Sequence, residues 1–364
     1  MTDENLYAIA FTMLPGFNDI QRKSIFEFYG SGIAIYNERQ KQKNAFVEVN
    51  FVQKNSLLST WPLQEAAAEV NFISKHGIKC ISVMDANYPN RLKHCIDAPT
   101  LLFVKGSDQF NLPYLLSVVG TRQHTIQVGK IIQELMEGLT HLNIGIISGM
   151  ALGVDGIAHQ KALENKIPTW GVLAHGLDQI YPNEHRKLAI DIMNNGGLIT
   201  ESRKGSSPLP YCFPKRNRIV AGICDATLVV ETDVKGGSMI TANIAFDYNR
   251  EVFAVPGKIH DPKSKGCLAL IKRDKAHIYH DVTSLLENMQ WPIKELTTPQ
   301  IQLDFLVLTE SERVLQHIAI HGPVHMEVIA NQLKINSSLL SNLLLGLEIK
   351  GQIQLLAGNL YSKR

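Results

Sequence analysis

The sequence lacks the features that mark several specialised classes of protein. Its 364 residues include no compositionally biased tract and only five cysteines, which form neither a C-x-x-C pair nor a Cys/His spacing typical of zinc sites. An odd number of scattered cysteines fits a reducing compartment. The N-terminal stretch MTDENLYAIAFTMLPGF has no basic leader and only a short apolar run. We therefore expect a cytoplasmic protein without a membrane span, a metal site or a cofactor.

The chain also lacks a large excess of charge of one sign. Whether it binds an anion such as a nucleic acid must therefore be judged from the local distribution of charge. The chain has 36 Lys and Arg residues against 34 Asp and Glu residues, a net charge of +2, which does not by itself indicate nucleic-acid binding. Between residues 201 and 222, however, five basic residues accompany a single acid. Three of the five, Lys215, Arg216 and Arg218, belong to the stretch FPKRNRIVAG. A helix beginning at Pro214 would carry these cations at its already positive amino end, so an anion is expected to bind there.

Short apolar runs alternate with helical patterns between residues 113 and 288. The apolar runs are YLLSVVG, NIGIIS, IPTWGVLA, GGLITE, ATLVVE and REVFAVPG. The helical stretches between them include VGKIIQELMEGLTHL, VDGIAHQKALEN, EHRKLAIDIMNN and SMITANIAFDYN. Because the runs are apolar throughout, both of their faces should be covered by helices, which predicts a doubly wound, mostly parallel α/β sheet.

Four of the predicted strands end in turns that contain glycine and open onto helices. These turns are GTRQHT, GMALGVDG, DVKGGSMIT and PGKIHDPKSKG. In a parallel sheet they converge at the carboxyl ends of the strands, where ligands bind. Glycine lets backbone N–H groups approach a ligand closely, and helix amino ends favour negative charge. The pattern predicts a site for an anion or a phosphate.

Smaller pieces flank the predicted sheet. We expect a small helical domain at residues 1–75, a connecting segment at 76–112, the α/β core at 113–288, a linker at 289–304 and a winged-helix domain at 305–364. The stretch LPGFNDIQRKSIFEFYGSGIAIYN resembles half of a helix-hairpin-helix unit, but Asn18 stands near the position of its second glycine, which favours a structural role. The basic residues Arg39, Lys41 and Lys43 are interpreted as a solvated face.

The C-terminal pattern is that of three helices and a hairpin. Thr309 and Glu312 are spaced as a capping box at the start of the first helix, and the hairpin is expected to turn near residues 357–359. The presumed recognition helix, NSSLLSNLLLGLEIKG, offers serine and asparagine but a single lysine, Lys350. Because groove reading depends on Arg and Lys, a protein-contact or regulatory role is favoured over DNA reading.

The motifs of the core resemble those of the DNA-processing protein A family (DprA, also called Smf). The matching stretches, in order, are VVGTR, SGMALGVDGIAH, GLDQIYPNEH, FPKRNRIVAG, GGSMITANIA, VFAVPG and SKGCLALI. The resemblance implies a Rossmann-like core with a small N-terminal helical domain of the SAM or helix-hairpin-helix type and a C-terminal winged helix. It also implies a homodimeric protein of natural transformation that protects incoming single-stranded DNA and loads the RecA recombinase onto it, without catalytic turnover.

The resemblance assigns residues to a DNA site and to a dimer contact. Arg122 corresponds to the family's DNA-contacting arginine in its G-[ST]-R turn, and FPKRNR corresponds to the basic wall of the same pocket. The implied nucleic-acid-binding residues are Gly120, Thr121, Arg122, Ser148, Gly149, Ala151, Lys215, Arg216, Asn217, Arg218, Gly236, Gly237 and Ser238. The implied dimer contacts are Leu268, Leu270, Ile271 and Ile278. In that segment, Leu268 and Lys275 stand where the family usually has asparagine and glycine.

The chemistry of the residues gives each cation a role. Arg122 follows a Gly-Thr turn at a strand end, from which its guanidinium can bind a phosphate through two hydrogen bonds, unless it folds back onto a carboxylate. Lys215 and Arg218, three residues apart, are expected to flank the ligand, while Arg216 or Asn217 holds the turn. The alternative is a helix with a solvated basic end.

Two other classes of function are compatible with the same fold. The core is also similar to phosphoribohydrolases, which cleave nucleoside monophosphates and carry a P-G-G-x-G-T-x-x-E motif. The corresponding stretch, VKGGSMITANIA, keeps both glycines but has no glutamate where the motif requires one. Glu231, beside a glycine turn, is the carboxylate relevant to that enzymatic reading. The other class is a protein-interaction scaffold with a vestigial nucleotide pocket.

Four further residues have two interpretations each. Phe213 and Tyr211 are either platforms for stacking bases or part of the core. Asp155 and His159, four apart on one helix, lack a third metal ligand at suitable spacing. We therefore interpret Asp155 as a cap or dipole partner at the helix start and His159 as a partly buried, hydrogen-bonded residue.

Overall fold

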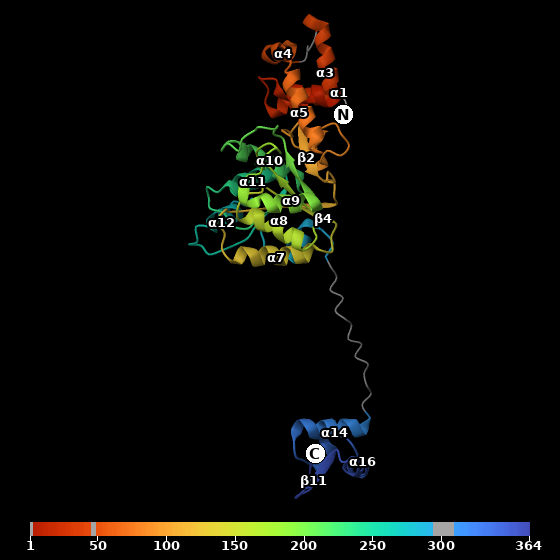
Figure 1. Cartoon of the computed structure of the whole chain (residues 1–364). Helices are drawn as coiled ribbons and strands as arrows, with labels where there is room; N and C mark the ends of the chain where they lie inside the picture. Colours follow the sequence, from red (N-terminus) through yellow and green to blue (C-terminus); the bar gives the residue numbers. More distant parts are fainter. Residues whose placement is uncertain (1–2, 45–48, 294–308) are drawn as a thin grey trace. The chain divides into compact units, whose positions relative to one another are not determined.

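The computed structural model describes residues 3–44, 49–293 and 309–364 (Figure 1). The chain forms two compact units, Met1–Lys294 and Glu295–Arg364. Part of the predicted linker, residues 294–304, and the first residues of the predicted winged-helix domain, 305–308, lie outside the described residues. In the parts of the chain that the structure describes, no helix combines the length and the apolar character that crossing a bilayer requires.

A nine-stranded sheet, counted over the described residues, forms the centre of the first unit. Its strand order is β1-β2-β6-β5-β4-β3-β7-β8-β9. The pairs β1/β2 and β2/β6 are antiparallel, and the other neighbours are parallel. The strands are Lys79–Ser82 (β1), Leu101–Gly106 (β2), Tyr114–Val119 (β3), Ile144–Ser148 (β4), Thr169–Val172 (β5), Gly196–Thr200 (β6), Ala226–Val229 (β7), Glu251–Ala254 (β8) and His277–Ile278 (β9). The predicted doubly wound, mostly parallel sheet is confirmed.

The six predicted strands are β3 to β8, and the structure adds three strands that the sequence did not indicate. Strands β1 and β2, with the short helix α6 (Asn90–Lys93) between them, lie in the segment that was predicted only to connect the helical domain to the core. Strand β9 has two residues and lies at the opposite edge. The predicted domain boundaries stay predictions, but residues 79–106 contribute to the same sheet.

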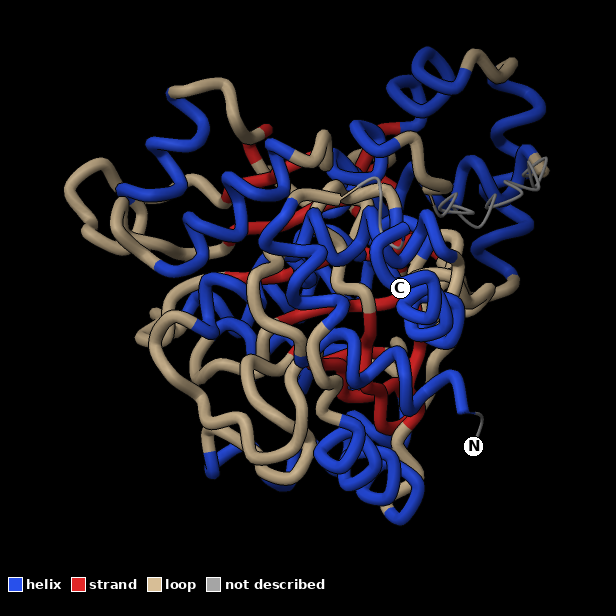
Figure 2. The backbone as a smooth tube through the Cα atoms, turned by 90° about the horizontal axis from the view of Figure 1, so that it is seen from above, coloured by secondary structure: helices blue, strands red, loops and turns tan. Residues whose placement is uncertain are grey.

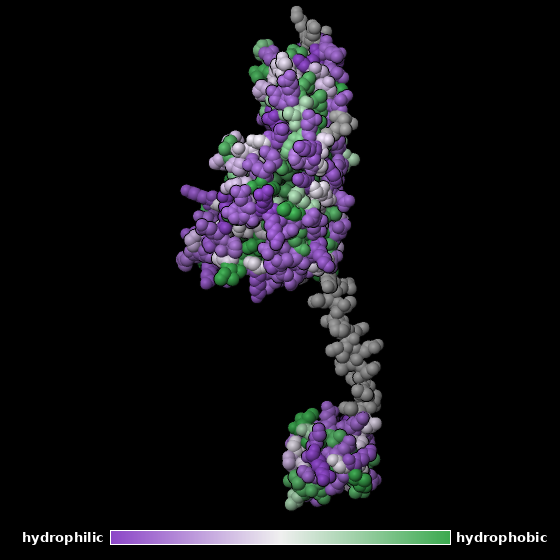
Figure 3. Space-filling model, in the orientation of Figure 1, coloured by the Kyte–Doolittle hydropathy of each residue, from purple (hydrophilic) through white to green (hydrophobic). Residues whose placement is uncertain are grey.

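Helices lie on both sides of the strands (Figure 2). The bounds are Gln127–Leu139 (α7), Val154–Glu164 (α8), Asn183–His185 (η2), Arg186–Asn195 (α9), Cys212–Ile223 (α10), Gly237–Asp247 (α11), Lys265–Lys272 (α12) and Val282–Met289 (α13). Strand β3 shows how its side chains are sorted: Leu116 and Val118 pack in the cluster with α7, α8 and α13, while Leu115 and Val119 pack in the cluster with α10, α11 and α12. Because both faces are buried, the strands are apolar throughout. The face of the first unit drawn in Figure 3 is mostly hydrophilic.

The helical region, residues 3–75, shares its hydrophobic core with the sheet. Its elements are Asp3–Met13 (α1), Asp19–Tyr29 (α2), Gly32–Glu38 (α3), Arg39–Asn44 (η1), Phe51–Leu58 (α4) and Leu63–Lys75 (α5). Phe11 and Trp61 belong to the same cluster as Leu102 of β2. Asn18 accepts a hydrogen bond from the Gln21 N–H at 2.8 Å, and the Gln21 side chain accepts one from the Asn18 N–H at 3.0 Å. Asn18 therefore caps α2.

The basic patch near residue 40 is only partly solvated. The Arg39 guanidinium is half-buried and donates to the Ser59 carbonyl oxygen at 2.7 Å. The Lys41 ammonium lies 2.7 Å from the Glu38 carboxylate, and the lysine side chain is exposed. The side chain of Lys43 lies outside the described residues. The predicted solvated face therefore holds for Lys41 and is wrong for Arg39.

The second unit has the predicted winged-helix architecture. Its elements are Glu310–His321 (α14), Val324–His325 (β10), Met326–Leu333 (α15), Ser337–Ile349 (α16), Ile353–Leu356 (β11) and Leu360–Lys363 (β12). The Thr309–Glu312 capping box is confirmed, with the Thr309 N–H donating to the Glu312 carboxylate at 2.8 Å. The hairpin of β11 and β12 turns at residues 357–359 as predicted. On α16, Leu345 and Ile349 are exposed.

Helix α10 begins at Cys212, two residues before the predicted start at Pro214. The Cys212 N–H donates to the Leu209 carbonyl oxygen at 2.9 Å, which closes a turn ahead of the helix. Pro214 is the third helical residue. A backbone N–H at this position has no intrahelical acceptor, so its absence in proline costs no helical hydrogen bond. The predicted start is therefore wrong by about half a turn, and the basic residues remain in the first two turns of the helix.

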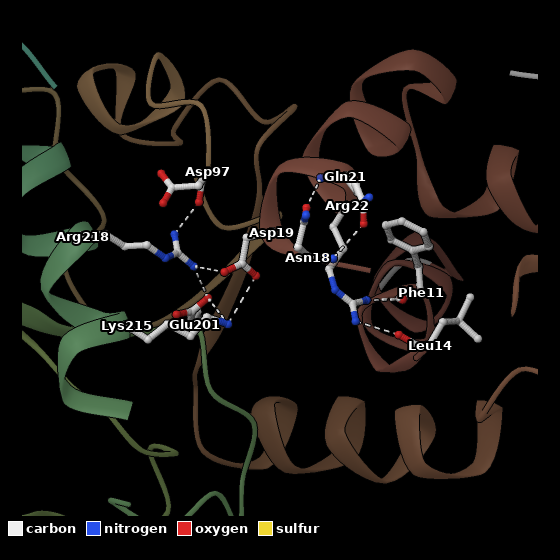
Figure 4. Close-up of polar contacts among 10 residues, drawn as sticks. All are labelled: Phe11, Leu14, Asn18, Asp19, Gln21, Arg22, Asp97, Glu201, Lys215 and Arg218. Atoms are coloured by element: carbon white, nitrogen blue, oxygen red, sulfur yellow. Dashed lines mark hydrogen bonds and ion pairs between the residues drawn. The ribbon is translucent and has the colours of Figure 1, made fainter. Parts of the chain in front are cut away.

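A cluster of four charged residues joins the helical region to the core (Figure 4). The Arg218 side chain is 6% exposed and donates to Glu201 at 2.6 Å and to Asp19 at 3.2 Å. It also donates to the Asp97 carbonyl oxygen at 2.5 Å. The Lys215 ammonium lies 3.3 Å from Asp19 and 3.5 Å from Glu201. We call Asp19, Glu201, Lys215 and Arg218 the charge cluster; Asp19 is the first residue of α2, and the other three belong to the core.

Burial and opposite charge act together on these groups. Burial raises the pKa of Glu201, while Arg218 and Lys215 act against that rise. Burial alone would lower the pKa of Arg218, but Glu201 and Asp19 outweigh it, so that this pKa is raised. Removing one partner of such a buried pair leaves the other as an uncompensated charge, which is strongly destabilising.

We expect the substitution Arg218→Met to lower the free energy of unfolding of the first unit by about 3 kcal/mol, because Glu201 then stays buried without its partner. The measurement is urea denaturation followed by far-UV circular dichroism. Lys130→Met is the matched control, since its ion pair with Glu134 is exposed and contributes less than about 1 kcal/mol. A loss for Arg218→Met that is no larger than the control's would contradict this account of the cluster.

Candidate nucleic-acid interface

A cavity of about 420 Å³ lies where the strand order of the sheet reverses. Strands β4, β5 and β6 follow on one side of β3, and β7, β8 and β9 follow on the other. Ligands of doubly wound sheets bind at this switch point, beyond the carboxyl ends of the strands. The cavity, called the switch-point cavity below, is lined by the turns after β3, β4 and β7 and by one face of α10. Predicted residues in the lining are Gly120, Thr121, Arg122, Gly149, Ala151, Arg216, Asn217, Gly236, Gly237 and Ser238.

The turn after β3 presents Arg122 at the rim of the cavity. Gly120 is required there, because a Cβ at this position would lie 2.5 Å from a methyl carbon of Val154. The Glu231 carboxylate accepts hydrogen bonds from the Thr125 N–H at 3.0 Å and from the Thr125 hydroxyl at 2.5 Å, which fixes the other end of the turn. Arg122 is exposed, and it has no ion pair within the described residues. The alternative in which it folds back onto a carboxylate is therefore not what the structure shows.

Arg122 instead lies over the ring of Phe213, with its guanidinium carbon 5.6 Å from the ring centroid. Phe213 is half-buried and its ring centroid is 6.0 Å from that of Tyr181. Tyr211 is 70% exposed. Neither Phe213 nor Tyr211 is part of the core, which removes the interpretation that both are simply core aromatics.

The turn after β4 is held by buried hydrogen bonds. The Asp155 carboxylate accepts from the backbone N–H groups of Gly149 at 3.1 Å and Ala151 at 3.2 Å. The Ser148 hydroxyl donates to the Val118 carbonyl oxygen at 2.6 Å, and Ser148 is buried and is not in the lining of the cavity. Burial raises the pKa of Asp155, and Arg216 acts against that rise. Asp155 is near the helix start as predicted, but its side chain holds this turn and not the end of its own helix.

Arg216 is buried and binds the backbone of two strand ends. Its guanidinium donates to the carbonyl oxygens of Gly149 and Val172. Burial lowers the pKa of Arg216 to about 10, although Asp155 acts against this. A Cβ at Gly149 would lie 2.6 Å from an Arg216 nitrogen, so only glycine leaves room for this contact. Arg216 therefore holds the turn after β4. The sequence alone leaves this role open between Arg216 and Asn217.

The turn after β7 ends at the open start of α11. Gly236 is the N-cap residue, and no side chain of the described residues caps this helix. The first N–H groups of a helix have no intrahelical partner, so those of Gly237 and Ser238 are donors at the cavity. The Ser238 hydroxyl is used to bond Thr232 at 2.7 Å. A Cβ at Gly237 would meet nothing within 4 Å, which shows that the space above the helix start is open.

The fourth glycine-bearing turn, after β8, does not reach the cavity. Its Lys263 carbonyl oxygen accepts a hydrogen bond from the Thr232 N–H at 2.7 Å, and Gly266 packs against the Thr232 backbone. The turn thus packs against the turn after β7 and does not line the cavity. The prediction that all four turns meet at the ligand is wrong for this one.

Lys215 and Arg218 are not in the lining of the switch-point cavity. The reason is helical periodicity: Phe213, Arg216, Asn217 and Val220 share the face of α10 toward the cavity, while Lys215 and Arg218 lie on another face, within the charge cluster. The two residues expected to flank the ligand therefore lie outside the switch-point cavity, and their contact with a ligand stays a prediction. The alternative of a solvated basic end is wrong, because Arg216 and Arg218 are buried.

The four residues implied in a dimer contact differ in exposure. Leu270 is 1% exposed and packs in the core, so it has no surface to offer to a partner. Leu268 and Ile271 are half-buried, and Ile278 on the edge strand β9 is 54% exposed. Lys275, one of the two departures from the family pattern, donates to the Asn243 side chain at 2.8 Å.

His159 is completely buried, where partial burial was predicted. Its Nδ1 lies 2.7 Å from the Thr169 hydroxyl, which itself donates to the Ile146 carbonyl oxygen at 3.0 Å, so Nδ1 is the donor. The Nε2 atom has no hydrogen-bond partner among the described residues. Burial lowers the pKa of His159 to about 3, and the neighbouring His185 and Arg216 act in the same direction. Across the described residues, no three His, Cys, Asp or Glu side chains are grouped to hold a metal ion.

Comparisons with known proteins identify relatives of the α/β core and of the winged-helix domain. The family model described as DNA recombination-mediator protein A matches residues 79–290, and the model of the DprA winged helix domain matches residues 307–359. The DNA processing protein DprA of Streptococcus pneumoniae is 40% identical over 192 residues, 52% of this chain and 67% of that protein. The protein Smf of Escherichia coli is 38% identical over 205 residues, 56% of this chain and 54% of that protein. The matches thus span between half and two thirds of these two relatives.

Two solved structures have the same fold. The crystal structure of DprA from Streptococcus pneumoniae matches with a TM-score of 0.61 and 30% identity, over 79% of this chain and 98% of that chain. A structure of DNA processing protein A from Helicobacter pylori, described for its single-stranded DNA binding mode, matches with a TM-score of 0.54 and 27% identity, over 60% of this chain and 97% of that chain.

Because His159 is buried and neutral, we can predict how the stability of the fold depends on pH. Its pKa is about 3 when folded and about 6.5 when unfolded, so the unfolded state binds more protons and stability falls as the pH drops below about 6.5. Between pH 7 and pH 5 the wild type should lose about 2 kcal/mol more than the His159→Asn variant, whose amide can still donate to Thr169. Urea denaturation of both proteins at the two pH values measures this difference. Equal losses in the two proteins would show that His159 is not neutral in the fold.

Proposed function

This chain belongs to the DNA-processing protein A (DprA/Smf) family of DNA recombination mediators, and from that premise we propose that it binds single-stranded DNA at the switch-point cavity, protects incoming strands and loads RecA onto them during natural transformation. The observation that carries the DNA-binding part is the meeting of Arg122 with the open start of α11 at one cavity. The structure of the Helicobacter pylori relative, described for single-stranded DNA binding, supports the same assignment.

The cavity offers a cation and N–H donors of the kind that the phosphates of a single strand need. Its phosphates require cations and N–H donors, and its bases require flat apolar surfaces. The face of the Arg122 guanidinium lies over Phe213, which leaves the N–H groups along its edge free to donate to a phosphate. The N–H groups of Gly237 and Ser238 supply further donors on the opposite wall. None of these groups reads a base edge, so the binding should not depend on sequence.

We expect no catalytic turnover. The carboxylate relevant to a hydrolase, Glu231, accepts two hydrogen bonds from Thr125 and does not line the cavity. The carboxylate at the floor of the cavity, Asp155, holds the backbone of the β4 turn. Release of free base from nucleoside monophosphates by the purified protein, lost in Glu231→Gln, would support the hydrolase instead.

The partners beyond DNA follow from the family. We propose a cytoplasmic homodimer, with Ile278 on the exposed edge strand β9 as the residue best placed for contact. The winged-helix domain is assigned a protein-contact or regulatory role, because the exposed face of α16 carries Leu345 and Ile349 where a DNA reader would need cations. Light scattering that shows a monomer throughout the micromolar range would remove the dimer from this proposal.

Arg122→Ala should weaken the binding of single-stranded oligonucleotides about tenfold at low salt, because it removes a charge-assisted contact to phosphate. The loss should be the same for oligonucleotides of different sequence, and the slope of log K against log salt should become shallower by about 0.7. Fluorescence anisotropy over a series of salt concentrations measures both quantities. Lys130→Ala, an exposed cation on α7 away from the cavity, is the control and should bind as the wild type does. Identical behaviour of Arg122→Ala and the control would refute the assignment of the site.

A further inference from the structure

Two further hollows lie around the start of α10, next to the switch-point cavity. The first, of about 460 Å³, shares Arg216 with the cavity and also contains Tyr211 and Lys215. The second, of about 160 Å³, shares Lys215 and Glu201 with the first and lies against Asp19 and Arg22 of the helical region. Lys215 therefore stands where a strand leaving the cavity past Arg216 would next meet a cation.

Tyr211 lies beside this path. It immediately precedes α10 and is 70% exposed, and its ring makes no aromatic contact within the described residues. An exposed aromatic ring next to a cation is the combination on which bases stack and phosphates bind in proteins that hold single strands. The hollow of Tyr211 and Lys215 thus has the chemistry of the switch-point cavity.

The Lys215 ammonium, however, already forms ion pairs with two carboxylates. Its side chain is 49% exposed, and its ammonium lies 3.3 Å from Asp19 and 3.5 Å from Glu201 (Figure 4). The two carboxylates are not equivalent. Glu201 belongs to the core and is bound at 2.6 Å by the nearly buried Arg218, so it stays in place whether or not Lys215 has another partner. Asp19 comes from the helical region, is 27% exposed, and is held less closely by Arg218, at 3.2 Å.

The helical region does not need the Asp19 side chain for its own structure. The amino end of α2 is capped by Asn18 and Gln21, which bond each other's backbone N–H groups. The half-exposed pair of Asp19 and Lys215 contributes little to stability, as is usual for ion pairs in contact with solvent. A carboxylate and a phosphodiester carry the same charge and accept hydrogen bonds alike, so one can replace the other at an ammonium group.

We propose that the Asp19 carboxylate pairs with Lys215 in place of a DNA phosphate. Through this ion pair, the helical region sets how strongly the strand is bound at Lys215. The inference rests on the proposed single-stranded DNA binding and concerns its regulation. Coupling between two sites is reciprocal, so a strand that displaces Asp19 from Lys215 also weakens the attachment of the helical region to the core.

The test is a double-mutant cycle on the full chain, read by anisotropy with a labelled oligothymidylate. Asp19→Asn should bind about fivefold more tightly than the wild type, with a salt slope steeper by about 0.7, because Lys215 loses one of its two carboxylate partners and can bind one more phosphate. Glu27→Gln is the matched control: it makes the same change of charge on the same helix, where Glu27 pairs with Lys23, and it should leave affinity unchanged. In a Lys215→Ala background, Asp19→Asn should have no effect.

The outcomes separate this inference from the function on which it rests. If Arg122→Ala weakens binding but Asp19→Asn does not strengthen it, the DNA site stands and the role of Asp19 is overturned. An equal gain from Asp19→Asn with and without Lys215 would also overturn it, because the effect would then be one of general charge. If the wild type binds no single-stranded DNA, both proposals fall. Asp19→Ser repeats the test with a different side chain, and thermal unfolding checks that each variant is folded.

Discussion

The arrangement of the whole site depends on how helix α10 distributes its cations. Three basic residues stand in its first two turns, and helical periodicity turns them to different sides. Arg216 points toward the switch-point cavity and binds the carbonyl groups of Gly149 and Val172. Lys215 and Arg218 point toward Asp19 and Glu201. One helix therefore forms a wall of the cavity and also the place where the helical region is attached.

The polar groups of the cavity are largely in use before a ligand arrives. Asp155 holds the turn after β4, and Ser238 bonds Thr232 at the start of α11. Glu231, which lies outside the lining, holds the turn after β3. The donors left over are the edge of the Arg122 guanidinium and the first N–H groups of α11. The lining also contains the exposed Asp233 carboxylate, which accepts a hydrogen bond from the Val234 N–H at 2.6 Å. Donors that are held in place in this way favour an anion and require little rearrangement to bind one.

Much of the fold could be predicted from the sequence, because unbroken apolar runs and glycine turns are local signals. The runs at β3 to β8, the Thr309–Glu312 capping box and the hairpin at residues 357–359 are all found. Strands β1 and β2 were missed because they precede the alternation of apolar runs with long helical stretches, although LLFV of β2 is itself an unbroken apolar run. The sides on which the α10 cations lie could have been predicted from the spacing of Phe213, Arg216, Asn217 and Val220. The pairing of Arg218 with Asp19 could not, because the two residues are 199 positions apart and only the folded chain brings them together.

The most direct test of the central claim is a crystal structure of the full chain with a bound oligothymidylate. The account predicts a phosphate within hydrogen-bonding distance of the Arg122 guanidinium and of the first N–H groups of α11. A strand bound elsewhere, with the switch-point cavity left unfilled, would contradict it.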